Sequence, residues 1–122
     1  TDHVDYCEAV EAQRQFRDEI TGVFAEHELD AIAFPDLKIV PRRIADLPQD
    51  QDDENYLINT FIASFSSCPA ISMPGGFTDS GLPVGVELLG TPLSEGKLLS
   101  IASRYETVVD PRKPPSTAPA IE

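Results

Sequence analysis

The stretch that decides the fold is Cys68-Pro-Ala-Ile-Ser-Met-Pro-Gly-Gly-Phe-Thr-Asp-Ser-Gly-Leu-Pro-Val-Gly-Val-Glu-Leu-Leu-Gly90. It contains two short apolar runs, Ala70–Met73 and Val84–Leu89, and proline and glycine bound both of them. Short apolar runs between turn-forming residues predict two buried strands. The residues between the runs suit a tight connection, because Gly81 can adopt a positive φ and Pro83 fixes the re-entry into the second strand.

Helices are predicted on both sides of this strand pair. From about residue 4 to residue 28, apolar residues recur at steps of three and four, which is the period of an amphipathic helix. The stripe expected to be buried consists of Ala9, Ala12, Phe16, Ile20 and Val23. Two further helices are predicted, from Glu54 to about Ser66 and from Glu95 to about Thr107. Asp2 and Ser94 are the expected N-caps of the first and last helices.

The remaining elements complete an α/β layout. Leu29–Phe34 predicts a short buried strand that ends at Pro35, because proline cannot donate to a ladder. Residues 36–53 predict a long solvated connection, which is unusual inside a compact domain. The Gly75-Gly76 pair predicts a sharp exit from its strand. The expected order is therefore α-β-α-β-β-α.

Length and composition limit the molecule to one domain or part of one. The chain has 122 residues, of which 41% are hydrophobic, a globular composition. Residues 1–109 are expected to form the folded segment, and the proline-rich residues 110–122 an extended or disordered tail. No apolar run is long enough to span a bilayer, and no signal peptide is recognisable, so we expect a cytoplasmic protein.

The net charge of −12 narrows the range of partners. It disfavours binding to nucleic acid and to anionic membranes, since both need basic patches. Two interpretations of the acidity remain open: an ordinary acidic surface, or adaptation to high salt. Secondary structure that is indifferent to the removal of molar salt would contradict the second interpretation.

Candidate catalytic and metal-binding groups are sparse. A serine nucleophile needs a base beside it, and Ser64, Ser66, Ser67 and Ser72 are instead expected to bond to nearby backbone. The histidines and cysteines lack the spacing of a zinc site, and the acidic residues 50–54 lack the glycine of a calcium loop. The sequence therefore predicts neither a metal nor a cofactor.

Three other residue types receive structural assignments. Cys7 and Cys68 are expected to be buried, reduced thiols. Lys38 and Lys97 are expected to be surface lysines. His27 is expected to lie near the free carbonyls at the end of the first helix.

The sequence resembles the C-terminal part of the amidase-signature hydrolases. Pro69–Phe77 followed by Gly81–Gly90 carries the central motif of the resemblance. Further similar positions are Arg14, Leu29–Pro35, Asn59-Thr60, Glu95, Leu98-Leu99, Ala102 and Glu106. The resemblance extends from about Tyr6 to Glu106 and implies a fragment of that family's mixed-sheet α/β fold.

The resemblance also implies a chemistry and its location. The family hydrolyses carboxylic amides with a serine nucleophile, a second serine that has a cis peptide bond, and a lysine. These groups lie in upstream motifs that this sequence does not contain, so no residue here inherits a catalytic role and the chain alone is expected to be inactive. The family's segment before the Pro-Ala strand lines the substrate pocket, which places Thr60, Ser64 and Ser67 near a small amide substrate.

Two functions follow, and the sequence leaves both open. The chain is either the C-terminal portion of an amidase that acts with a catalytic chain, or a stand-alone binding or dimerisation module without catalysis. Exposed strand edges and apolar surface predict self-association or pairing in either case. The family includes hydrolases and transamidases that act on charged tRNA, and the sequence does not distinguish them.

Overall fold

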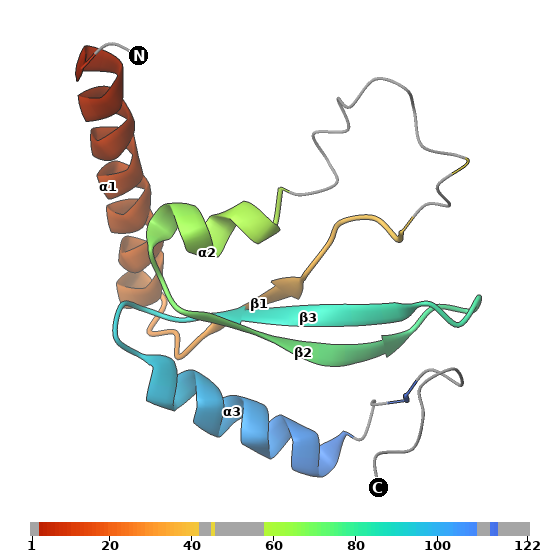
Figure 1. The fold of residues 1–122 in the computed structure, drawn as a ribbon. Helices are drawn as coiled ribbons and strands as arrows, with labels where there is room; N and C mark the ends of the chain where they lie inside the picture. Colours follow the sequence, from red (N-terminus) through yellow and green to blue (C-terminus); the bar gives the residue numbers. More distant parts are fainter. Residues whose placement is uncertain (1–2, 42–44, 46–57, 110–112, 115–122) are drawn as a thin grey trace, which may run out of the picture.

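The computed structural model describes residues 3–41, 45, 58–109 and 113–114. The elements follow in the order α1 (His3–Glu26), β1 (Ile32–Pro35), α2 (Thr60–Ser66), β2 (Ala70–Phe77), β3 (Pro83–Leu89) and α3 (Glu95–Val108). The predicted α-β-α-β-β-α order is therefore confirmed (Figure 1). The predictions for Asp2, for most of the 36–53 connection, for the start of the second helix and for most of the tail lie outside the described residues.

A three-stranded antiparallel sheet forms the centre of the molecule. The strand order is β1-β3-β2, so β3 pairs with both of its neighbours. The register places Leu88 opposite Ala33 on one side and opposite Ile71 on the other. In Figure 1, α1 and α2 lie on one face of the sheet and α3 lies on the other.

Alternation along β3 supplies a core to each face, because successive side chains point to opposite sides. Leu88 packs with Met73 of β2 and with Leu98 and Ala102 of α3. Leu89 packs on the opposite face with Phe24 of α1 and with Cys68. The two short apolar runs of the sequence thus form the centre of both layers, as predicted.

The predicted buried stripe of α1 is wrong for the first half of the helix. Ala9 and Ala12 are exposed, and Phe24, which the periodicity did not select, is the buried residue. A helix of 24 residues is about 36 Å long. Figure 1 shows that its first half extends beyond the sheet and α2. Only the last turns of α1 therefore meet the core, and Cys7, predicted to be buried, is exposed.

The glycine pair does not end its strand. Gly75 and Gly76 lie inside β2, where the pairing shifts from Pro74↔Gly85 to Gly76↔Val84, the register of a bulge. Gly76 has a φ of 131°, and a Cβ at Gly75 would lie 2.8 Å from Cγ2 of Val86. Both positions require glycine, which allows the strand to continue to Phe77 instead of stopping at Met73.

Helix boundaries differ from the prediction in two places. Asn59 lies in a turn and α2 begins at Thr60. Ser94 occupies the N-cap position of α3, but its side chain makes no capping hydrogen bond and its buried Oγ has no partner among the described residues. The start of α3 is fixed from outside instead, by a 2.8 Å ion pair between Lys97 and Asp30. That hydrogen bond and the lysine charge lower the pKa of Asp30.

Candidate functional site

The carboxyl end of β1 carries a group of polar contacts between three strands. The hydroxyl of Ser72 on β2 donates to Oδ2 of Asp36 at 2.5 Å. The amide of Asp36 donates to the carbonyl of Gly85 on β3 at 3.1 Å. Asn59, just before α2, donates to the carbonyl of Pro35 at 2.7 Å. These bonds connect the end of β1 to both other strands and to the start of α2.

A missing side chain makes room for the Asp36 carboxylate. A Cβ added at Gly85 would overlap that carboxylate. Glu87 lies two residues further along β3, opposite Ser72 and opposite Phe34. It shares their face of the sheet, so a second carboxyl group lies close to Asp36.

The two carboxyl groups are incompletely paired. Oδ1 of Asp36 and Oε1 of Glu87 are buried and have no hydrogen-bond partner among the described residues. Burial raises the pKa of Glu87 above its ordinary value of 4.5, and the charge of Asp36 raises it further. Because both effects disfavour the ionised form, Glu87 keeps its proton to a higher pH in the folded chain than in the unfolded chain.

This shift gives stability a defined pH dependence. A raised carboxyl pKa means that the folded state binds more protons, so stability falls as the pH rises from 4.5 through the folded pKa of Glu87. We expect Glu87→Gln to remove this loss, because the amide cannot ionise. The free energy of unfolding, measured in urea at several pH values, should fall less steeply in the variant. Parallel profiles for the two proteins would contradict the assignment.

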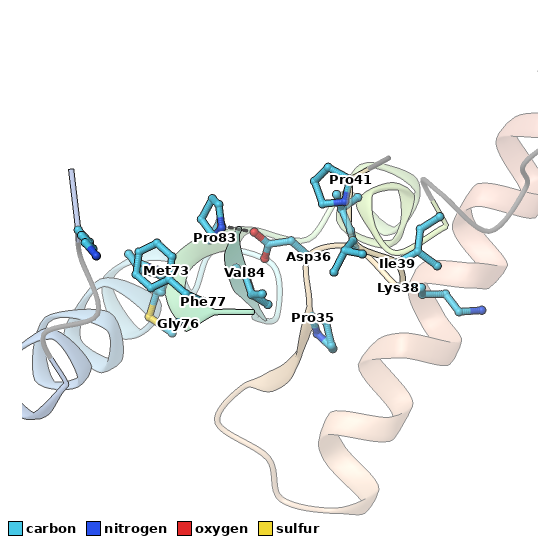
Figure 2. A pocket seen from close by; sticks show the side chains of 16 residues that line it. Pro35, Asp36, Lys38, Ile39, Pro41, Met73, Gly76, Phe77, Pro83 and Val84 are labelled. Atoms are coloured by element: carbon cyan, nitrogen blue, oxygen red, sulfur yellow. Dashed lines mark hydrogen bonds between the residues drawn. The ribbon is translucent and has the colours of Figure 1, made fainter. Parts of the chain in front are cut away.

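A cavity of about 670 Å³ opens beside the polar contacts. The segment 36–41 forms one wall, and the ends of β2 and β3 form the other. Figure 2 shows Asp36 between Val84 and Ile39, with the Lys38 side chain pointing away from the carboxylate. The lining is largely apolar, and Ser72 and Asp36 are polar groups within it.

The Ser72–Asp36 pair does not form a hydrolytic centre. An ordinary carboxylate is a weak base for an alcohol, and among the described contacts no imidazole or amine bonds to Ser72. No group of histidine, cysteine and acidic side chains suited to a metal occurs in the part of the chain that the structure describes. The contacts therefore connect strands, and any chemistry would need groups from elsewhere.

The residues predicted to line a substrate pocket lie along α2, away from this cavity. Thr60 begins the helix and is exposed. Ser64 is exposed, and its hydroxyl donates to the carbonyl of Phe61 at 3.0 Å. Ser67 ends the helix in the left-handed region, with φ 52°. None of the three lines the cavity, and their role at a substrate remains a prediction.

The other serines divide between local and long-range bonding. Ser66 is fully buried, and its hydroxyl donates to the carbonyl of Ile62 at 2.7 Å, which confirms the expected local bond. The prediction is wrong for Ser72, whose partner Asp36 is distant in sequence. The one sequence signal for this cluster is Glu87, a lone acid inside the apolar run Val84–Leu89.

Comparison with known proteins identifies relatives over most of the chain. The sequence profile of the family described as Amidase matches residues 1–99. The A-chain component of the glutamyl-tRNA(Gln) amidotransferase of Chlorobium phaeobacteroides is 41% identical over 103 residues, which are 83% of this chain and 21% of that protein. The same component from Pseudomonas aeruginosa is 37% identical over 109 residues, 86% of this chain and 21% of that protein.

Solved structures agree with the sequence relatives. The peptide amidase of Stenotrophomonas maltophilia superposes with a TM-score of 0.74 at 30% identity, covering 93% of this chain and 22% of that chain. The corresponding glutamyl-tRNA(Gln) amidotransferase component of Thermotoga maritima gives a TM-score of 0.69 at 32% identity, covering 84% and 22%. The chain thus spans about a fifth of the length of the relatives it matches. On its sequence and its fold, the chain belongs to the amidase family.

Proposed function

We propose that the chain supplies the C-terminal, structural portion of an enzyme that hydrolyses carboxylic amide C–N bonds. The supporting observation is the family match over residues 1–99 combined with coverage of only about a fifth of each relative. In this proposal the catalytic serines and lysine belong to the portion of the fold that the chain does not cover. The folded contribution is residues 1–109, and the proline-rich residues 110–122 are a tail.

A chimera tests this proposal directly. In the Stenotrophomonas maltophilia peptide amidase, the segment matched by this chain is replaced by the chain itself. We expect the chimera to hydrolyse a peptide amide, and we expect both the 122-residue chain alone and the amidase without the segment to release no more ammonia than buffer does. Turnover by the isolated chain, or a folded chimera without activity, would contradict the proposal.

Within that enzyme we propose that Thr60, Ser64 and Ser67 line the substrate pocket. Support comes from their spacing, which places them along one side of α2, and from the exposure of all three. In the active chimera, Ser64→Val should raise KM several-fold, because it adds bulk and removes a hydroxyl at the proposed pocket wall. The matched control is Ser100→Val on the exposed side of α3. Equal KM values for the two variants would remove Ser64 from the pocket.

A stand-alone binding or dimerisation module is the second candidate. It is favoured by the surface, since among the described residues fourteen large hydrophobic side chains are exposed and only seven hydrophobic residues are buried. Such a surface favours association with a partner or a second copy. The amidotransferase relatives are named as subunits, and are by that name parts of larger enzymes. A monomer by light scattering at micromolar concentration would exclude self-association.

Location and partners complete the proposal. No helix within the described ranges is long and apolar enough to cross a membrane. We propose a cytoplasmic location, without nucleic-acid or membrane partners, which cell fractionation followed by immunoblotting would test. Recovery of the chain in the membrane fraction would contradict it. Whether the complete enzyme is a hydrolase or an amidotransferase would follow from assaying the chimera with water or ammonia acceptors.

A further inference from the structure

The outer surface of α2 differs from every other exposed helical surface of the described chain. Phe61 and Phe65 lie one turn apart on it and are 49% and 55% exposed. Their rings are packed edge to face, with centroids 5.9 Å apart. Ile58, just before the helix, is exposed as well. We call Ile58, Phe61 and Phe65 the aromatic face of α2.

Charge is absent from this helix. The sequence of α2 is Thr-Phe-Ile-Ala-Ser-Phe-Ser, without an acid or a base, whereas a quarter of the whole chain is charged. A solvated helix usually carries charged side chains on its outer side. An uncharged helix with two exposed aromatic rings has the composition of a buried interface centre, where aromatic residues are enriched and charges are depleted.

The other helices do not share this composition. The protruding half of α1 carries acidic side chains such as Glu8 and Glu11, and the latter pairs with Arg14 at 3.8 Å. On α3, the exposed Leu99 lies between Lys97 and the polar residues that follow it. These surfaces suit water, so the aromatic face is the surface that most needs a cover.

Contacts behind α2 fix its position. Nε of Arg17 on α1 donates to the carbonyl of Ser66 at 2.8 Å, at the end of the helix. At the start, Asn59 donates to Pro35. Between these points, Ile62 and Ala63 pack against the core formed by Phe24, Cys68 and Leu89. The aromatic face is therefore presented on a fixed support, which lowers the ordering cost of binding.

We propose that the aromatic face of α2 is the surface on which the rest of the amidase fold packs, through an uncharged apolar patch of that polypeptide. This inference rests on the proposed function, and it adds the place of contact. The occupant follows from the lengths: the chain covers 22% of the peptide amidase, so most of that fold is available to cover this face. A second copy of this chain is the less suitable occupant, because two chains of net charge −12 repel each other.

Co-expression tests the inference. The full 122-residue chain is expressed with a tagged Stenotrophomonas maltophilia peptide amidase from which the matched segment has been deleted. Three forms of the chain are compared: the unaltered chain, Phe61→Asp with Phe65→Asp, and Leu99→Asp as the matched control on α3. Far-UV circular dichroism of each chain verifies folding. If the double aspartate variant does not fold, Phe61→Ser with Phe65→Ser replaces it.

We expect the double variant to reduce the amount of co-purified complex by about tenfold or more, because buried aromatic residues dominate interface energies. The Leu99 variant should form as much complex as the unaltered chain. Equal complex formation by all three chains would overturn the aromatic face as the contact but leave the proposed function standing. The absence of a complex with the unaltered chain would contradict the proposed function and this inference together.

Discussion

Replacement of Leu89 by alanine is expected to lower the free energy of unfolding by about 2–5 kcal/mol. Leu89 is 1% exposed and packs against Phe24 and Cys68 at the centre of the layer that joins the sheet to α1 and α2. The truncation removes apolar contacts and leaves a cavity that β3, paired on both sides, cannot close.

Urea-induced unfolding, followed by far-UV circular dichroism, measures this effect. The control is Leu99→Ala on α3, where the side chain is 60% exposed and the same truncation should change stability by no more than about 0.5 kcal/mol. A loss at Leu89 as small as that at Leu99 would mean that this layer is not packed as described.

The second large effect is expected at Gly85 and depends on its neighbour. Gly85→Ala should destabilise the chain by about 1–3 kcal/mol, because the new methyl group overlaps the Asp36 carboxylate. That carboxylate cannot easily move away, since Ser72 bonds to it and the Asp36 amide bonds to the Gly85 carbonyl.

A double-mutant cycle isolates this contact. In an Asp36→Ala background the overlap is gone, so Gly85→Ala should become neutral or stabilising, because alanine is favoured over glycine in a strand by about 0.5–1 kcal/mol. Gly96→Ala on α3, with open space around its Cβ position, should stabilise the chain in either background. An unchanged penalty at Gly85 without Asp36 would contradict the geometry of the cluster.

The family motif determined what could be read in advance about the two strands after Cys68. Pro69–Phe77 and Gly81–Gly90 identified both strands and their turn, and Gly81 has the positive φ, 81°, that the turn required. These features depend on local backbone preference, which a sequence displays directly. The bulge at Gly75 was not predictable, because its cause is the close approach of β3.

Burial on α1 shows where local patterns fail. The apolar spacing predicted the helix correctly, but it could not show that only the last turns meet the sheet. The hydrophobic period reports which side of a helix is apolar, and not how much of its length a partner covers. In this chain the exposed half of α1 and the aromatic face of α2 both lie beyond the core that the described residues form (Figure 1).

The polar cluster at the end of β1 depends entirely on tertiary structure. Asp36 and Ser72 are 36 residues apart in the chain, and only the β1-β3-β2 pairing brings them to hydrogen-bonding distance. The sequence by itself determined the family, the order of the elements and the strands of the core, because these follow from local periodicity and a local motif. Tertiary structure alone decided which carboxyl groups meet, which glycines need the space of a missing side chain, and which helix faces remain uncovered, because each of these depends on contacts between residues distant in the chain.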